Sequence, residues 1–320
     1  MKKAGTKTPK SKVSLVVSQD YLPAILSLLS KAKKKIDILS FSFAIGSAGG
    51  KLSFNSAPYQ IANKLKQLKD KKGDKLKIRF FTEGLRETAD RNRVTARFLA
   101  QAGVEVRYGS THAKGFCIDG QFVFFGSTNL TNQSIMKNNE ANLLIADKKM
   151  AKEFTRYFEH LWNGGGHGGI QLNAPFLADG DFKDALIKMI DRAQKRVEFS
   201  IYFFNHREIE NALIRAHARG VIVTGFVHQH NAFALLYIWA NRSTVKRIKA
   251  AGIEDLYLSV PTTFSHSKYL VIDRKEVALG TGNWLVEDVT THPQLYIHLK
   301  DATLARALVR HLTYQIKNQT

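Results

Sequence analysis

The chain has 320 residues, 44% hydrophobic and 23% charged, which is typical of a globular protein large enough for one or two domains. Its single cysteine, Cys117, excludes an intramolecular disulfide framework, and no Cys/His cluster has the spacing of metal ligands, so we expect no metal and no other cofactor. The formal net charge of +21 predicts a polyanionic partner, nucleic acid first and an anionic membrane surface second.

Hydropathy and the basic start of the chain predict a cytoplasmic protein. The first residues, MKKAGTKTPKSK, have no apolar segment beside them, unlike a secretory signal peptide. The chain also lacks a run of about 18 apolar residues, so no membrane span is predicted.

Predicted strands and helices follow one another in the same order twice. The first half is expected to alternate strand and helix at 13–17, 21–35, 36–45, 61–72, 75–81 and 97–103. The second half is expected to repeat this series at 170–175, 181–196, 197–204, 207–220, 221–227 and 247–252. Each series ends in a pair of strands, and the first half closes on a helix over 150–162. This alternation predicts an α/β fold in which each half is a mixed β-sheet flanked by helices.

The glycine-rich run GGGHGG at 164–169 marks the boundary between the repeats. We therefore expect a basic flexible tail at 1–12, a first half at 13–165 and a second half at 166–320. Two halves related by an internal two-fold axis are equivalent to a dimer fused into one chain. The chain is therefore expected to act as a monomer, with an active site where the halves meet.

One motif occurs in both halves. Residues 112–129 read HAKGFCIDGQFVFFGSTN and residues 266–283 read HSKYLVIDRKEVALGTGN. His, Lys, Asp, Gly and Asn have the same spacing in the two copies. The shared residues that can carry chemistry are His112, Lys114, Asn129, His266, Lys268 and Asn283.

These residue types suit the cleavage of a phosphodiester. One imidazole can attack phosphorus and form a phosphohistidine, while the second protonates the leaving oxygen and later activates water. The lysines supply positive charge and the asparagines supply amide donors to the phosphate oxygens, so no divalent metal is required. Ser127 and Thr281 lie in the same turns and are expected to add hydroxyl contacts to substrate. A His-x-Lys sequence on a strand would point both side chains to one face.

The doubled pattern resembles the signature of the phospholipase D superfamily, and the resemblance covers essentially the whole chain because both halves follow the repeat. It implies two pseudo-symmetric phospholipase D-like halves with the active site at their interface. Carried over by position, it implies that His112 is the nucleophile and His266 the general acid. It also implies that Asp119 and Asp273 are mostly structural.

Members of this superfamily often carry a carboxylate shortly after each motif that orients a catalytic imidazole. Glu140 fits this position in the first half, whereas the equivalent position in the second half is Gln294. If the orienting residues act across the two halves, Glu140 supports His266 and Gln294 supports His112. The tyrosyl-DNA phosphodiesterase branch has a similar Glu/Gln asymmetry with Glu on the nucleophile, which would exchange the two roles.

The first hypothesis for the substrate is nucleic acid: a nuclease of low sequence specificity that prefers single-stranded DNA and also takes RNA. The net charge of +21 supports this hypothesis. Aromatic residues at strand ends, Phe43 and Tyr202 among them, are candidates for base stacking, although ordinary core packing explains any one of them as well. Phe41, Phe203 and Phe204 belong to the same group.

Two alternatives remain open. A phospholipase D or phosphatidyltransferase similar to cardiolipin synthases would use the basic surface to bind anionic phospholipids. For such an enzyme, the apolar segment FALLYIW at 233–239 is the best candidate to enter a bilayer, although we expect it to form a buried helix. A binding protein with an inactive site is disfavoured, because both motifs keep His, Lys and Asn.

Overall fold

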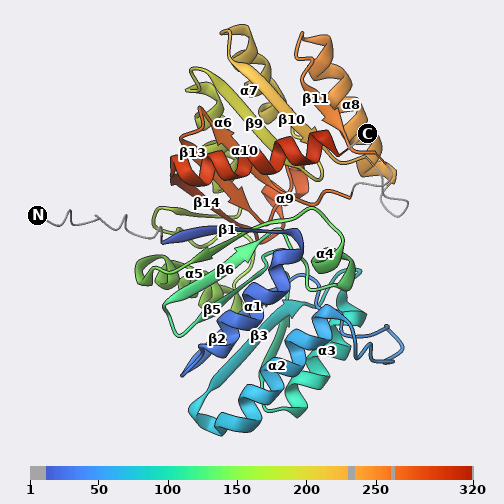
Figure 1. Cartoon of the computed structure of the whole chain (residues 1–320), viewed down its shortest axis with the longest axis vertical. Helices are drawn as coiled ribbons and strands as arrows, with labels where there is room; N and C mark the ends of the chain where they lie inside the picture. The colour runs from blue at the N-terminus through green and yellow to red at the C-terminus, as the bar shows by residue number, and fades with distance from the viewer. Residues whose placement is uncertain (1–11, 230–234, 261–263, 319–320) are drawn as a thin grey trace, which may run out of the picture.

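Two mixed β-sheets of seven strands each form the frame of the molecule (Figure 1). The computed structural model describes residues 12–229, 235–260 and 264–318. The strand order is β1-β7-β6-β5-β2-β3-β4 in one sheet and β11-β10-β9-β12-β13-β14-β8 in the other. When the second order is reversed, its strands correspond one by one to those of the first, with β8 at the place of β1 and β11 at the place of β4. The repeat predicted from the sequence therefore extends over the whole sheet.

The first sheet comes entirely from the first half of the chain. Its strands are β1 (Val13–Val17), β2 (Lys35–Ser40), β3 (Lys77–Glu83), β4 (Glu105–Gly109), β5 (Gly115–Ile118), β6 (Phe122–Gly126) and β7 (Ala141–Ile145). Strands β2, β3 and β4 are parallel, and the remaining neighbours are antiparallel.

The second sheet repeats this arrangement. Its strands are β8 (Phe176–Ala178), β9 (Arg196–Ile201), β10 (Ile222–Val227), β11 (Leu256–Leu258), β12 (Tyr269–Ile272), β13 (Glu276–Gly280) and β14 (Leu295–Lys300). Strands β9, β10 and β11 are parallel, and the remaining neighbours are antiparallel. The mixed sheets predicted for the two halves are therefore confirmed.

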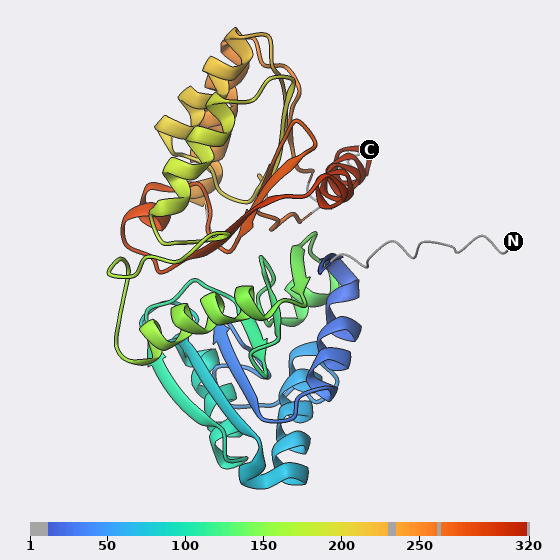
Figure 2. The same cartoon turned by 90° about the vertical axis from the view of Figure 1, so that its left-hand side faces the viewer.

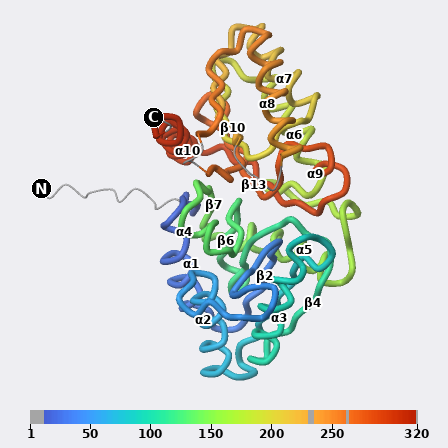
Figure 3. Tube along the Cα trace, turned by 90° about the vertical axis from the view of Figure 1, so that its right-hand side faces the viewer, coloured from blue at the N-terminus to red at the C-terminus, as the bar shows by residue number. Residues whose placement is uncertain are grey.

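The helices fall into two groups. Those of the first half are α1 (Tyr21–Ser30), α2 (Ala57–Lys72), α3 (Ala89–Gln101), α4 (Asn132–Met136) and α5 (Lys148–Trp162). Those of the second half are α6 (Asp181–Asp191), α7 (Arg207–Ala218), α8 (Leu235–Ala250), α9 (Val286–Thr290) and α10 (Ala302–Lys317). Figure 3 traces the chain through the first half and then through the second, ending in α10.

Two of these helices join the halves. Figure 2 shows α5 and α10 at the boundary between them. Helix α5 lies on β5 and β6 of its own sheet and also contacts β8 of the other, while α10 lies on β12 and β13 and also contacts β1. Each closing helix therefore packs against the edge strand of the opposite half, as an internal two-fold axis requires.

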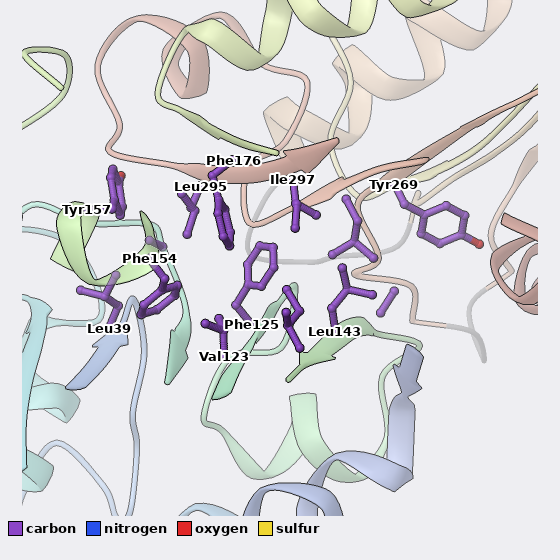
Figure 4. Close-up of a cluster of buried hydrophobic side chains, with 14 of the residues drawn as sticks. Leu39, Val123, Phe125, Leu143, Phe154, Tyr157, Phe176, Tyr269, Leu295 and Ile297 are labelled. Carbon is purple, nitrogen blue, oxygen red and sulfur yellow. The ribbon is translucent and has the colours of Figure 1, made fainter. Parts of the chain in front are cut away.

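The largest apolar cluster lies between the sheets rather than inside one half. Figure 4 shows Phe125 and Leu143 of the first sheet beside Leu295 and Ile297 of the second. All four side chains are at most 1% exposed. Burial of apolar surface is the main favourable term in folding, and it is non-directional, so a shared cluster of this size ties the two sheets into one unit. Two further clusters fill the outer faces, beneath α1 and α2 in one half and beneath α6 and α7 in the other.

Several expectations about individual elements are wrong. The strand expected at 170–175 begins instead at Phe176, because Pro175 has no N–H to donate to a ladder. The aromatic-rich strands expected at 36–45 and 197–204 end at Ser40 and Ile201, where the chain leaves the sheet. The segment 233–239 was expected to form a buried helix. Its first two residues lie outside the described part, and the rest begins α8 with mostly exposed side chains.

Candidate active site

Both motifs place their histidine and lysine immediately before a central strand. His112 and Lys114 precede β5, and His266 and Lys268 precede β12, so the expectation that His-x-Lys lies on a regular strand is wrong by a few residues. Each lysine Nζ folds back to donate to the carbonyl oxygen of the histidine in its own motif, at 2.6 Å in the first half and 2.8 Å in the second. This short bond fixes the two side chains of a motif relative to each other.

Hydrogen bonds that cross between the halves orient the two imidazoles. His112 Nδ1 lies 3.1 Å from Gln294 Oε1, and His266 Nδ1 lies 3.1 Å from Glu140 Oε2. The backbone repeats the exchange: His112 N donates to the Pro293 carbonyl and His266 N to the Asn139 carbonyl, both at 2.9 Å. Each half therefore holds the histidine of the other, as expected if the orienting residues act across the two halves.

The two orienting residues are themselves fixed by hydroxyl groups. Ser127 Oγ donates to Glu140 Oε2 at 2.5 Å and Ser134 Oγ donates to Glu140 Oε1 at 2.6 Å. Thr281 Oγ1 donates to Gln294 Oε1 at 3.0 Å. Ser127 and Thr281 were expected to touch substrate, but both are fully buried, and their hydroxyls are used by Glu140 and Gln294. That expectation is wrong, because these residues follow β6 and β13 and turn toward the next strand of the sheet.

Charged groups are concentrated in this buried site. Burial lowers the pKa of Lys268 to about 7, against the attraction of Glu140. Burial, together with repulsion by Lys268, also holds the pKa of Lys114 well below its ordinary value. Two buried ammonium groups that repel each other make a strong site for an anion, because a phosphate between them would restore both pKa values.

The two imidazoles differ because their partners differ. Burial lowers the pKa of His266 to about 4, although the attraction of Glu140 opposes this effect. Burial and the positive charge of Lys114 hold the pKa of His112 well below its ordinary value, and the partner of its Nδ1 atom is the neutral amide of Gln294. Burial alone would raise the pKa of Glu140, but His266 and Lys268 bring it down to about 2, so this carboxylate stays ionised.

The motif asparagines, Asn129 and Asn283, occupy equivalent places after β6 and β13. Within the described residues, the Oδ1 atom of each is buried and has no hydrogen-bond partner. Buried amide oxygens are normally paired, so two unpaired ones at equivalent positions mark acceptors that are free to bind a donor group of a ligand.

Aromatic rings flank both histidines. Tyr202 lies edge-on to His266 with ring centroids 4.6 Å apart, and Phe41 lies edge-on to His112 at 4.5 Å. The lysine of the same motif lies over each ring, at 5.1 Å from Phe41 and 5.2 Å from Tyr202. Phe43 is not at the site: it is fully buried in the outer cluster against Phe80, so its assignment to substrate binding is wrong. Its place is taken by Phe41, the first residue after β2, as Tyr202 is the first after β9.

Sequence reasoning also missed Asp288 in α9. Its carboxylate accepts from Asn283 N and lies 2.7 Å from His292 Nδ1. The His292 ring is 6.5 Å from that of His112. Asp288 and His292 stand at the positions equivalent to Ser134 and Asn138, which bind Glu140 in the first half. Glu140 and Asp288 are therefore buried carboxylates of the two halves that stand at different positions of the repeat.

The motif aspartates lie away from the chemistry. Asp119 accepts hydrogen bonds from the backbone N–H groups of residues 33, 34 and 35, and Asp273 accepts from those of 194, 195 and 196. Both have positive φ, 54° and 50°. They hold the start of β2 and β9 against the hairpins that follow each His-x-Lys, which is a structural role.

Replacing Asp119 with Ala is expected to lower the free energy of unfolding by roughly 2–3 kcal/mol, because three backbone donors lose their acceptor. Asp119→Asn is the matched control. It keeps one acceptor oxygen and tolerates the positive φ, so it should cost less. Urea unfolding measures both variants. Equal losses for Ala and Asn, or no loss for Ala, would contradict the structural role.

The fold and the paired site define a class of proteins with two equivalent His-x-Lys motifs in one chain, and the comparison with known families agrees. The family model described as "Cardiolipin synthase, PLD-like domain" matches residues 25–162 and 186–315. The chain therefore belongs to this family of the phospholipase D superfamily.

Curated relatives match only parts of the chain. A probable cardiolipin synthase of Bacillus subtilis is 29% identical over 149 residues, which is 46% of this chain and 29% of the relative. A mitochondrial cardiolipin hydrolase of Chlamydomonas reinhardtii is 37% identical over 67 residues, which is 20% of this chain and 30% of the relative. The matched regions thus span less than a third of either relative.

Solved structures share the fold over nearly the whole chain. A phosphatidylserine synthase of Haemophilus influenzae superposes with a TM-score of 0.72 at 12% identity, covering 96% of this chain and 86% of the other. A polyphosphate kinase of Porphyromonas gingivalis gives a TM-score of 0.68 at 15% identity, covering 95% and 47%. At such identities these likenesses show the fold alone.

The expectation that nucleic acid is the partner is wrong. The curated relatives are named for cardiolipin, and the structural neighbour with the higher TM-score is named for phosphatidylserine. A net charge of +21 attracts any polyanion, so it did not discriminate between nucleic acid and anionic lipid. Within the described ranges, no helix combines the length and apolar character needed to cross a bilayer.

Proposed function

We propose that this protein cleaves the headgroup phosphodiester of an anionic phospholipid and passes the phosphatidyl group to water or to an alcohol. The observation that carries the proposal is the crossed site. Both imidazoles use Nδ1 for an orienting bond, which leaves Nε2 for chemistry, and two buried lysines stand beside them. The names of the cardiolipin and phosphatidylserine enzymes described above support the substrate class.

In the first step, His112 Nε2 attacks phosphorus and the bond from phosphorus to the headgroup oxygen breaks. His266 donates the proton that the leaving oxygen needs. In the second step, water or an acceptor alcohol gives its proton to His266 and attacks phosphorus. The phosphorus–nitrogen bond then breaks and His112 is regenerated. Lys114, Lys268 and the two motif asparagines bind the non-bridging oxygens throughout.

The roles of the two histidines follow from their partners. Glu140 attracts a proton on His266, whereas neutral Gln294 cannot do the same for His112. A bound phosphodiester adds negative charge and raises both pKa values further. His266 is then the group that holds a proton, and His112 is the neutral nucleophile.

The substrate class is tested with purified protein in EDTA. Cardiolipin, phosphatidylglycerol, phosphatidylcholine and single-stranded DNA are offered separately, and products are identified by mass spectrometry. We expect turnover of the anionic phospholipids in EDTA. Phosphatidic acid as product would indicate hydrolysis, and a new phosphatidyl ester formed with added glycerol would indicate transfer. DNA cleavage with intact lipid, or activity only with added Mg²⁺, would contradict the proposal.

Exchanging the two orienting residues tests their electrostatic difference. Glu140→Gln is expected to lower turnover about 10- to 100-fold and to move the pH optimum to lower pH, because the pKa of His266 loses the attraction that raises it. Gln294→Glu is the matched change. A carboxylate there raises the pKa of His112, so the optimum should move to higher pH. The check is a pH–rate profile of both variants, and shifts in the same direction would contradict the assignment.

A further inference from the structure

The first turn of α8 exposes a cluster of large apolar side chains. Leu235 is 62% exposed, Leu236 is 86% exposed and Trp239 is 70% exposed. Isolated exposed apolar residues are ordinary on protein surfaces, but several in one helical turn mark an interaction surface. We call Leu235, Leu236 and Trp239 the α8 tip.

The fold does not require these residues. Asn92 in α3 and Asn241 in α8 are equivalent, since the side-chain oxygen of each accepts from the backbone N–H of a residue just beyond the adjacent strand, at 2.8 Å and 2.7 Å. Counting back from these asparagines, the tip aligns with the charged residues Arg86, Glu87 and Asp90. At these equivalent positions the first half has charged residues and the second half has apolar ones. The fold of a half therefore does not depend on apolar residues there.

The α8 tip is continuous with the candidate active site. Beneath it, Ile238 is buried with Tyr202, Phe203 and Leu285 in one cluster. Phe203 stacks on the neighbouring Tyr237 with ring centroids 4.8 Å apart, and Tyr202 contacts the His266 ring. A continuous cluster of apolar side chains thus connects the exposed tip to the ring that flanks His266.

Charge along α8 fits an anionic membrane. The exposed residues Arg242 and Lys246 follow the tip along the helix, and α8 contains no Asp or Glu. An apolar turn followed by basic residues is typical of helices that lie in the interface of an anionic bilayer. Acidic residues lie nearby as well: after burial, Glu287, Asp288 and Glu87 raise the pKa of Tyr237. The basic residues Arg242 and Lys246 lie on the same helix as the α8 tip, whereas these acidic residues belong to other segments.

We propose that the α8 tip docks on an anionic phospholipid bilayer, with Leu236 and Trp239 in the boundary between headgroups and acyl chains and with Arg242 and Lys246 on lipid phosphates. This inference rests on the proposed function and adds the surface by which the enzyme reaches its substrate. Docking there would place the bilayer next to the apolar cluster that includes Tyr202.

Tryptophan fluorescence reports on the tip directly. The chain has three tryptophans; Trp162 and Trp284 are buried at 7% and 0% exposure, so Trp239 is the exposed one. We expect its emission to move to shorter wavelength on mixing with vesicles of phosphatidylcholine and cardiolipin, and less with phosphatidylcholine alone. No change with either vesicle would overturn the proposal.

Vesicle co-sedimentation tests the same surface. The double variant Leu236→Ser/Trp239→Ser should bind cardiolipin-containing vesicles at least about tenfold more weakly, since it removes two large apolar groups. Ile222→Ser is the matched control, because Ile222 is also exposed, at 44%, but lies on β10 outside the tip. Equal loss in the control, or none in the double variant, would overturn the proposal, as would sedimentation velocity showing that the tip joins two copies of the chain.

Failure of this inference is distinguishable from failure of the proposed function. Vesicle binding needs no turnover, so it tests docking by itself. Turnover of a monomeric short-chain phosphatidylglycerol needs no bilayer, and it should be the same in the double variant and the parent. Parental turnover of this soluble substrate with unchanged vesicle binding by the variant would keep the function and reject the docking surface. Vesicle binding that depends on the tip, without turnover of any phospholipid, would reject the function.

Discussion

Replacing His112 with Asn is expected to lower phospholipid turnover by at least about 10⁴-fold, because the attacking imidazole is lost. Asn is small enough to fit the buried site and to keep a hydrogen bond to Gln294. His266→Asn should lower turnover by about 10²- to 10⁴-fold, the range that general acid–base groups contribute. Steady-state kinetics measures both variants. His298→Asn, a histidine that pairs with Glu276 on the second sheet, is the control and should match the parent.

A trapped intermediate distinguishes the two histidines. With a p-nitrophenyl phosphodiester, whose leaving group needs no proton, His266→Asn should release one equivalent of nitrophenolate quickly and then stall. The stalled protein should carry a phosphohistidine at residue 112, visible by mass spectrometry, because no base remains to activate water. His112→Asn should form none. A phosphohistidine at residue 266 would exchange the roles, and a covalent adduct in neither variant would reject the mechanism.

Replacing Lys268 with Met is expected to lower turnover roughly 10²- to 10³-fold, because a fixed charge on the phosphate oxygens is lost. The same change should alter stability in a pH-dependent way. The folded-state pKa of Lys268 is lowered to about 7 from an ordinary value of 10.5. Between these two pH values the unfolded chain binds more protons at Lys268 than the folded chain does. This lysine therefore lowers the free energy of unfolding at neutral pH, and the loss becomes smaller as the pH rises toward 10.5.

The melting temperature of Lys268→Met relative to the parent should therefore be highest near neutral pH and should fall as the pH is raised. The variant also loses the hydrogen bond from Lys268 Nζ to the His266 carbonyl, which lowers its melting temperature by an amount that does not depend on pH. The test is therefore the change of the melting-temperature difference with pH, not its sign at one pH. Lys195→Met, at an exposed position, should show no such trend. A flat difference for Lys268→Met would contradict the buried ammonium pair.

The substrate class could not be predicted from charge. A net charge of +21 acts through a long-range field that does not distinguish a nucleic acid from an anionic lipid surface. The one local feature that favoured lipid, the apolar segment at 233–239, was expected to be buried because apolar residues usually are. Whether a helical turn faces the core or solvent depends on the elements packed against it. Among residues 235–239, Ile238 is the one whose side chain is buried.

The sequence by itself determined the family, the internal repeat and the motif residues His112, Lys114, His266 and Lys268 of the candidate site. These follow from local periodicity and from a motif with fixed spacing, which need no knowledge of distant contacts. Only the tertiary structure decided which orienting residue bonds to which imidazole, that Phe41 rather than Phe43 flanks the site, and how burial moves each pKa. Those properties depend on which residues of the two halves meet, because hydrogen bonds and desolvation act only at short range.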